Sequence, residues 1–180
     1  METKYNVSQS ELRNWLYKAD HHYLAARLLY LHGLLFVAEE NAGFAIELIL
    51  KCACKKQKVD FSSKRHKLIE LWPLAKPPIN LDEGFMKYLE KLQTALYNRH
   101  PNAENWDSGH KANDQFDALD LLYLKLRKWL IEIISDETGI PTEVDLGKKE
   151  ESFFSNVVTR HGAWSLATIL KRSNTRIDLL

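Results

Sequence analysis

Two groups of side chains in this 180-residue sequence have the types and spacing needed to bind phosphate. The first is a run of cations within positions 51–67, where the only acidic residue is Asp60. Its basic members are Lys51, Lys55, Lys56, Lys58, Lys64, Arg65 and Lys67, with His66 among them. Clustered cations in a loop can contact several phosphate oxygens at once, so the run predicts a phosphate-binding rim. In the alternative interpretation, the cations compensate the dipole at the end of a helix and keep the following loop solvated.

The second group is the sequence Asn98-Arg99-His100-Pro101, followed by Trp106 and His110. Arginine is a planar, bidentate phosphate donor, histidine titrates near neutral pH, and an exposed tryptophan can stack on a base. The combination predicts a nucleotide or RNA site, with Arg99 and His100 on the phosphate and Trp106 as the stacking ring. The alternative is a helix terminus whose arginine is ion-paired internally and whose tryptophan packs on the protein.

Three aspartates, Asp114, Asp117 and Asp120, are spaced so that neighbours share a helix face, a pattern that could bind a metal ion. Acidic residues early in a helix are also favoured by its dipole, and we expect this simpler role. His21 and His22 are adjacent, and no histidine pair in the sequence has the four-residue helical spacing of a zinc site. We therefore expect no metal and no cofactor.

Familiar enzyme motifs are absent from the sequence, which has no Gly-x-Ser-x-Gly elbow, no phosphate loop and no dinucleotide fingerprint. Cys52 and Cys54 lie two positions apart in an apolar helical stretch, so they point about 200° apart and we expect inert thiols. Free thiols and the absence of an apolar N-terminal run predict a cytoplasmic protein. The richest apolar stretch, 28–38, is interrupted by His32 and Gly33, so no membrane span is expected. No catalytic residue is assigned.

Composition narrows the class of protein further. The 25 basic residues are balanced by 24 acidic ones, and a formal net charge of +1 excludes the strong overall field of histone-like proteins. Apolar residues make up 45% of the chain, which is enough to build a core. A chain of 180 residues predicts one domain with a short appendage.

Long intervals without glycine or proline must position these residues, and they carry apolar side chains at three- and four-residue steps. Ser8 and Glu11 have the spacing of a capping box, and Gly33 is the expected stop of the first helix. The further helices are expected at 35–57, 67–74, 81–98 and 112–135. We expect no strands and no internal repeats. The sequence thus predicts an all-α fold, an antiparallel up-and-down four- or five-helix bundle.

The bundle is expected over residues 8–136, followed by a polar linker at 137–151 and a C-terminal helical appendage at 152–180. Apolar residues return in the appendage, among them Phe153, Phe154 and Trp164. The appendage either covers the bundle as a lid or forms a partner-binding or dimer-building arm.

In their order and spacing, four segments resemble the HEPN family of small helical bundles, which are often associated with nucleotide or RNA metabolism. The matching segments are Trp15-Leu-Tyr-Lys-Ala-Asp20 with Ala25-Ala-Arg-Leu-Leu29 and Gly33-Leu34, then Ala45-Ile-Glu47 with Leu50-Lys51, then His66-Lys-Leu68 with Leu71, and finally Tyr97-Asn-Arg99-His-Pro101. The resemblance covers residues 12–135 of the chain. The resemblance implies a four- or five-helix bundle, commonly a homodimer, with a cleft near the dimer interface lined by the arginine-containing turn.

Many HEPN proteins are endoribonucleases, including toxins that pair with a nucleotidyltransferase antitoxin, and they use an arginine and a histidine four to six residues apart. Here His100 is adjacent to Arg99, and His110 follows after ten intervening residues. The family spacing occurs only from Arg27 to His32, within one helix, where the side chains point about 140° apart. We regard that match as a coincidence.

The sequence therefore predicts a HEPN-like dimeric module that binds a nucleotide, RNA or protein partner at a basic cleft. Its expected phosphate contacts are Arg99 and His100, with a rim formed by Lys64, Arg65, His66 and Lys67. One alternative is a metal-independent endoribonuclease toxin that uses Arg99 and His110 and has a nucleotidyltransferase-type antitoxin as its partner. The other alternative is a non-catalytic dimerisation scaffold whose C-terminal helices recruit another protein.

Overall fold

Residues 7–97 and 112–135 are described in the computed structural model of the chain, and their regular elements are all helices. These are α1 (Gln9–Leu31), α2 (Leu35–Lys56), α3 (Leu68–Ala75), α4 (Glu83–Tyr97) and α5 (Ala112–Ser135). The all-α prediction is confirmed, and each helix begins and ends within two residues of its predicted bounds. The predicted linker at 137–151 and appendage at 152–180 lie outside the described residues. None of the described helices combines the length and apolar character that crossing a membrane requires.

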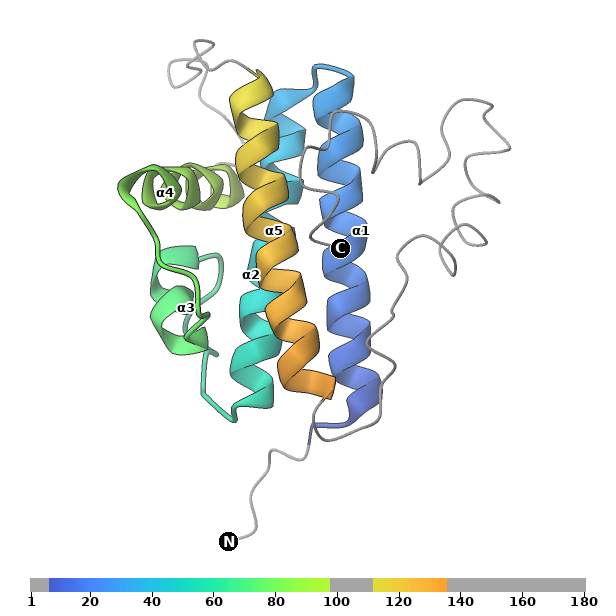
Figure 1. Cartoon of the computed structure of the whole chain (residues 1–180), viewed down its shortest axis with the longest axis vertical. Coiled ribbons are helices and arrows are strands. Elements are labelled where there is room, and N and C mark those ends of the chain that lie inside the picture. The colour runs from blue at the N-terminus through green and yellow to red at the C-terminus, as the bar shows by residue number, and fades with distance from the viewer. Residues whose placement is uncertain (1–6, 98–111, 136–180) are drawn as a thin grey trace, which may run out of the picture.

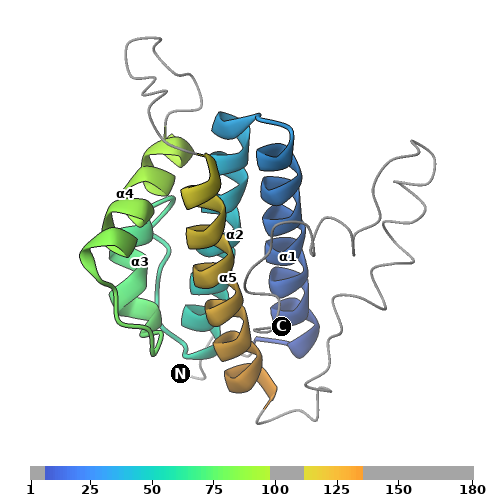
Figure 2. The same cartoon turned by 45° about the horizontal axis from the view of Figure 1, so that its top comes forward.

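Helix α2 is the centre of the bundle, because it contacts each of the other four helices. The three long helices α1, α2 and α5 lie side by side, and α3 and α4 lie on the opposite side of α2 from α1 (Figure 1). The colours in Figure 2 show that α1 runs in one direction and α2 and α5 in the other, whereas α4 lies across the long axis of the bundle (Figure 1). The helices α1 and α2 are therefore antiparallel, as predicted for an up-and-down bundle, and α4 departs from that arrangement because it crosses the bundle.

Local sequence signals set both ends of α1. Ser8 is its N-cap, and the Ser8 hydroxyl oxygen accepts a hydrogen bond of 3.3 Å from the backbone N–H of Glu11. At the other end, Gly33 adopts the left-handed conformation, with a φ of 74°. The N–H groups of Gly33 and Leu34 donate to carbonyls of the last turn, at 2.9 Å each. This Schellman arrangement satisfies the terminal carbonyls and turns the chain directly into α2.

A glycine in α2 allows the last turn of α4 to approach closely. A Cβ atom added at Gly43 would lie 2.8 Å from Leu96 Cγ and 3.1 Å from the carbonyl oxygen of Leu92. Such short contacts would force the two helices apart, so only glycine fits without movement. The close approach holds the end of α4, and with it Tyr97, against α2.

A buried polar layer joins α1 to α5. Asp20 accepts hydrogen bonds from Nε and Nη2 of Arg127, at 2.8 and 3.2 Å, and Asp120 is ion-paired with Arg27. All four residues are at most 3% exposed. Each buried charge faces an opposite one, which offsets the cost of removing it from water.

Asp120 belongs to this layer, so the role predicted for it, compensation of a helix dipole, is wrong. The carboxylate of Asp120 lies buried against Arg27, so it does not simply compensate the dipole at the start of α5. Arg27 is 0% exposed and committed to this pair, which agrees with treating its spacing to His32 as a coincidence.

Both cysteines lie buried in α2 and are free. The Cys52 thiol donates a hydrogen bond of 3.6 Å to the backbone carbonyl of Leu12. Burial raises the pKa of Cys52 to about 12 and that of Cys54 to about 11. Thiols that keep their protons at neutral pH are poor nucleophiles, in agreement with the predicted inertness.

Candidate functional site

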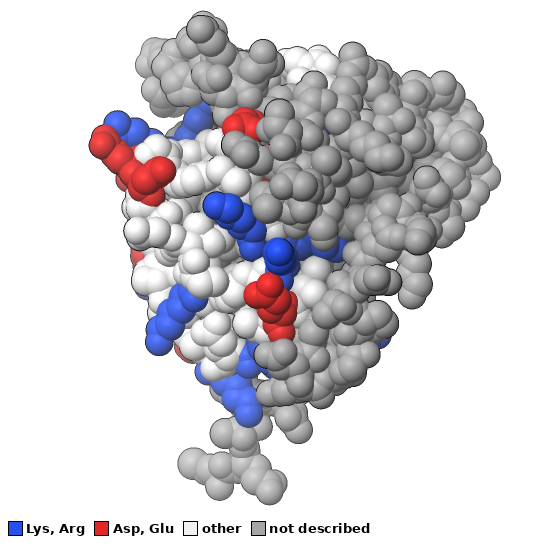
Figure 3. All heavy atoms as spheres, in the orientation of Figure 1, with Lys and Arg blue, Asp and Glu red and all other residues white. Residues whose placement is uncertain are grey.

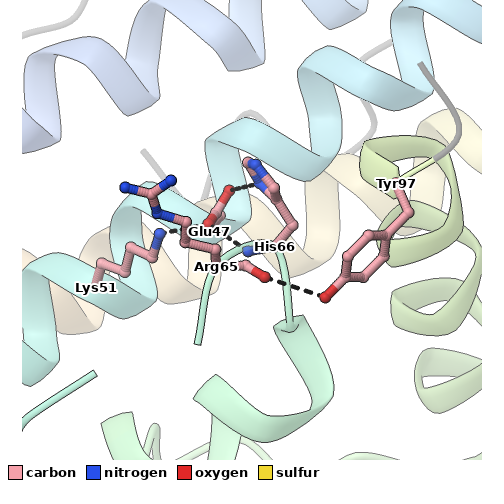
Figure 4. A network of polar contacts seen from close by, with 5 residues as sticks. All are labelled: Glu47, Lys51, Arg65, His66 and Tyr97. Carbon is pink, nitrogen blue, oxygen red and sulfur yellow. Dashed lines mark hydrogen bonds and ion pairs between the residues drawn. The ribbon is translucent and has the colours of Figure 1, made fainter. Parts of the chain in front are cut away.

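His66 lies in the loop between α2 and α3, where a single carboxylate of α2 holds it (Figure 4). Glu47 Oε2 is 2.9 Å from His66 Nδ1, and Glu47 Oε1 accepts a hydrogen bond of 2.9 Å from the backbone N–H of His66. The φ angle of His66 is 56°, a left-handed conformation that is uncommon outside glycine. Glu47 therefore fixes both the backbone and the ring of a strained residue.

Glu47 is ionised at neutral pH although it is only 3% exposed. Burial alone would raise its pKa, but hydrogen bonds from Lys51 and from the backbone N–H of His66 hold the pKa below the ordinary value of 4.5. Lys51 Nζ lies 2.5 Å from Glu47 Oε1, one helical turn further along α2. An ionised carboxylate can only accept hydrogen bonds, so His66 Nδ1 carries a hydrogen and Nε2 is the ring nitrogen left for another partner.

The outer edge of the His66 ring is accessible to a ligand. Its side chain is 27% exposed, and no residue in the described part of the chain hydrogen-bonds to Nε2. Phe44 and Tyr97 pack edge-to-face against the ring, with centroids 5.8 and 6.2 Å away. A fixed imidazole with one accessible nitrogen can donate a hydrogen bond to a phosphate oxygen or take a proton from a hydroxyl group.

Tyr97, the last residue of α4, ties that helix to the loop. Its hydroxyl donates a hydrogen bond of 3.1 Å to the backbone carbonyl of Arg65, and its side chain is 51% exposed (Figure 4). The Arg65 side chain is exposed and forms no ion pair within the residues the structure describes. An exposed guanidinium that is not ion-paired can contact a phosphate with two parallel N–H groups. We call Phe44, Arg65, His66 and Tyr97 together the His66 surface.

Other cations of the predicted rim are partly neutralised by acidic residues. Lys64 Nζ and Lys67 Nζ lie 2.5 and 2.7 Å from the two carboxylate oxygens of Glu70. Lys55 pairs with Glu11 at the start of α1. On the described face drawn in Figure 3, Lys and Arg side chains are spread out, with acidic side chains beside several of them. The cluster is therefore less positive than its composition indicates.

The second predicted group lies outside the described residues. Arg99, His100, Trp106 and His110 all fall within 98–111, so their predicted roles stay predictions. In the sequence, Arg99 comes two residues after Tyr97, so the chain that carries it leaves α4 at the His66 surface.

The described residues contain no candidate metal site. No three His, Cys, Asp or Glu side chains there are grouped closely enough to hold a metal ion. Of the three spaced aspartates, Asp120 is committed to Arg27, and the side chain of Asp114 lies outside the described part.

Phe44, Glu47 and Tyr97 belong to this site, and sequence reasoning did not select them as site residues. Glu47 lies on α2 between Ile46 and Leu48, within an otherwise apolar stretch. The available signal was that a carboxylate in such a position needs a polar partner from another part of the chain. The identity of that partner does not follow from the spacing.

No protein-family model matches the chain, and neither a curated protein nor a solved structure is significantly similar to it. The HEPN resemblance therefore rests on the sequence motifs.

Proposed function

We propose that the chain is a HEPN-like module that binds the phosphate group of a nucleotide or RNA at the His66 surface. The observation that carries the proposal is that the Glu47 carboxylate contacts both the backbone N–H and the ring Nδ1 of His66. A left-handed conformation in a residue other than glycine costs about 1–3 kcal/mol, and such residues cluster at functional sites. Here a buried carboxylate stabilises the strained residue and leaves its Nε2 accessible, and the residue before it in the sequence is the exposed Arg65.

The charges around this surface favour an anion. Ion pairs join Lys51, Lys64 and Lys67 to only two carboxylates, those of Glu47 and Glu70, and Arg65 adds a further cation. The Arg65 guanidinium suits a phosphate because it can donate two parallel hydrogen bonds. Nε2 of a protonated His66 ring would supply a third donor.

The residues that follow Tyr97 extend the proposed site. Arg99 and His100 are further phosphate contacts, and Trp106 is the stacking ring, all on the evidence of the sequence. Arg99→Ala is expected to weaken nucleotide or RNA binding, and unaltered affinity in this variant would reject the role of Arg99.

Binding by the full chain can be measured by the fluorescence anisotropy of labelled ATP and of a labelled RNA decamer. Arg65→Ala should weaken binding on the order of 10-fold, because hydrogen bonds to a charged group contribute about 1.5–3 kcal/mol. Added salt should weaken binding too, because phosphate contacts release counterions.

Lys87→Ala is the matched control for this experiment. Lys87 is 72% exposed and lies in the first turns of α4, at the other end of the helix from Tyr97. Removal of this charge should leave affinity unchanged. An Arg65→Ala protein that binds ATP and RNA as tightly as the wild type would overturn the proposal.

The proposed module is a homodimer, as the resemblance implies. Sedimentation equilibrium of the full chain should then give twice the chain mass of 20.9 kDa. A single-chain mass at all concentrations would reject the dimer. A nucleotidyltransferase-type antitoxin is the proposed protein partner if the module belongs to a toxin–antitoxin pair, and co-purification with such a protein would test that part.

A second candidate function, a metal-independent endoribonuclease, is favoured by the Glu47–His66 pair. A carboxylate that fixes Nδ1 leaves Nε2 to move a proton. In such a cleavage, the RNA 2′-oxygen passes its proton to Nε2 of His66, which acts as the general base, and bonds to phosphorus. The bond to the 5′-oxygen breaks, this oxygen takes a proton from water, and a 2′,3′-cyclic phosphate remains. Arg65 or Arg99 would stabilise the charge that develops on the phosphate.

Gel analysis of RNA incubated with purified protein tests this second function. The sequence-based pair for the reaction is Arg99 and His110, whereas the geometry favours His66. Loss of cleavage in His66→Ala, with cleavage retained in His110→Ala, would assign the proton transfer to His66, and the reverse result would assign it to His110. No cleavage of varied RNAs by the wild type would reject the enzyme and leave the binding function standing.

A further inference from the structure

Four aromatic rings from four separate parts of the chain form a continuous row across the His66 surface. The row consists of His22 of α1, Phe44 of α2, His66 of the loop and Tyr97 of α4. Successive ring centroids are 5.2, 5.8 and 6.2 Å apart. We call this set the ring row, and it exists only because the bundle brings these four elements together.

We propose that the ring row is a stacking platform and that the ligand of the His66 surface is a single-stranded nucleic acid. This inference rests on the proposed function, because it names the ligand of the same phosphate-binding surface. Proteins that bind single strands without sequence preference combine aromatic rings, on which bases stack, with cations that follow the phosphate backbone. The ring row and Arg65 provide both parts.

Two of the three contacts in the ring row are edge-to-face. Phe44 and His66 are inclined by 77°, and His66 and Tyr97 by 85°. In an edge-to-face pair, the ring that contributes its edge keeps its faces clear of that neighbour. Tyr97 is the ring most open to solvent, at 51% exposed, so a base can reach it without movement of the protein.

Hydrogen bonds hold the other end of the ring row in place. His22 Nδ1 lies 3.0 Å from Oδ1 of Asn41, whose Nδ2 donates to the backbone carbonyl of Val37 at 2.8 Å. His66 is held in the same way by Glu47. Rings that are oriented before binding lose little side-chain entropy when a base stacks on them, which favours affinity.

The extent of the ring row separates a single strand from other ligands that carry phosphate. His66 and Tyr97 are 27% and 51% exposed and can offer two stacking positions, whereas a mononucleotide brings only one base. In a duplex the base faces are already stacked on each other, so the duplex could offer mainly its phosphates to Arg65. A single strand is therefore the ligand that uses both the rings and the cation.

The test compares labelled probes on the full chain by fluorescence anisotropy. The probes are a single-stranded RNA decamer, the DNA decamer of the same sequence, the RNA decamer paired in a duplex, an abasic ribose-phosphate decamer and ATP. The single strands should bind about 10-fold more tightly than the duplex, the abasic decamer or ATP. Tighter binding of either single strand than of the abasic decamer supports the ring row, and a difference between the RNA and the DNA decamer shows whether the 2′-hydroxyl contributes.

Substitutions at Tyr97 separate stacking from phosphate binding. Tyr97→Ala should weaken single-strand binding on the order of 10-fold and leave the abasic decamer unaffected. Tyr97→Phe keeps the ring and removes only the hydrogen bond to Arg65, so its loss of single-strand affinity should be much smaller than that of Tyr97→Ala. The exposure of Tyr97 makes misfolding a small risk, and circular dichroism of both variants checks it.

Two results would overturn the stacking platform. One is equal affinity for the base-bearing and abasic decamers, and the other is an equal loss of affinity for every probe in Tyr97→Ala. If Arg65→Ala still weakens binding in either case, the proposed phosphate site survives without the platform. If no probe binds at all, the proposed function fails as well.

Discussion

Tyr23 of α1 and Tyr123 of α5 stack on each other, with ring centroids 4.2 Å apart and ring planes inclined by 10°. Each hydroxyl donates to the aspartate of the opposite helix, at 2.7 Å from Tyr23 to Asp120 and at 2.6 Å from Tyr123 to Asp20. The motif Asp-x-x-Tyr-Leu-x-x-Arg occurs at 20–27 and again at 120–127, contrary to the expectation of no internal repeat. Because α1 and α5 are antiparallel, the two copies face each other with approximate two-fold symmetry (Figure 1).

This symmetry predicts equal costs for the loss of either aspartate. Asp120→Ala leaves Arg27 buried without its countercharge, and Asp20→Ala does the same to Arg127. Each variant should lose about 3–5 kcal/mol of unfolding free energy, measured by urea denaturation. Glu83→Ala, which breaks an exposed pair with Lys87, should cost less than about 1 kcal/mol. A loss that small in either aspartate variant would contradict a buried ion pair.

Replacement of Tyr23, Arg27 and Asp120 together, which form one half of the polar layer, should destabilise the protein far less than removal of one charge. The triple variant Arg27→Met, Asp120→Leu and Tyr23→Phe removes at once the ion pair and the hydrogen bond that join these three residues. Its unfolding free energy should lie closer to that of the wild type than to that of Asp120→Ala. If the triple variant were less stable than Asp120→Ala, then Tyr23, Arg27 and Asp120 would have to stabilise the fold through more than their contacts with one another.

Gly43→Ala should both destabilise the bundle and weaken ligand binding. The added methyl group would meet Leu96 Cγ at 2.8 Å, and overpacking of this kind costs about 1–3 kcal/mol. Displacement of the last turn of α4 would also move Tyr97 away from His66. Urea denaturation and RNA binding measure the two effects.

Leu96→Ala provides the control for Gly43→Ala, because it removes the side chain that the new methyl group meets. On its own it should cost about 2–5 kcal/mol as a cavity-forming substitution. The double variant should lose less stability than the sum of the two single variants, because the contact that couples them is gone. Strict additivity would argue against the close approach.

Acid should destabilise the protein in part through Glu47. Its pKa in the folded chain lies below the ordinary 4.5, so the unfolded chain binds this proton more readily. The stabilisation from ionised Glu47 is therefore complete above about pH 4.5 and is lost as the pH falls through the lower folded value. Because Glu47→Gln cannot titrate, its stability difference from the wild type should shrink in acid. Urea denaturation across the acid range measures this difference, and a constant difference would refute the assignment.

The two thiols should react slowly in the native protein. Cys52 and Cys54 are buried, with pKa values of about 12 and about 11, so little thiolate exists at neutral pH. A thiol-specific disulfide reagent should label neither cysteine rapidly under native conditions and both of them in urea. Immediate native labelling would contradict the burial of α2.

Local sequence determined the helices of this protein. The cap at Ser8, the stop at Gly33 and the apolar periodicity all act within a few residues, so their effect can be predicted without knowledge of the fold. The same reasoning predicted that the Cys52 and Cys54 thiols are inert and selected His66 and Arg65 as candidates. It could not show that Lys64 and Lys67 share the carboxylate of Glu70 and are partly neutralised by it, because side-chain direction in a loop does not follow from spacing.

Only the tertiary structure decided which distant residues meet. Glu47 and His66 are 19 positions apart, and Asp20 and Arg127 are 107 apart. The contacts depend on the directions of the helices and on their relative rotation and translation, which come from the packing of whole apolar faces. Helical periodicity places a polar residue on a face of its own helix, but it carries no information about which charge on another helix will face that residue.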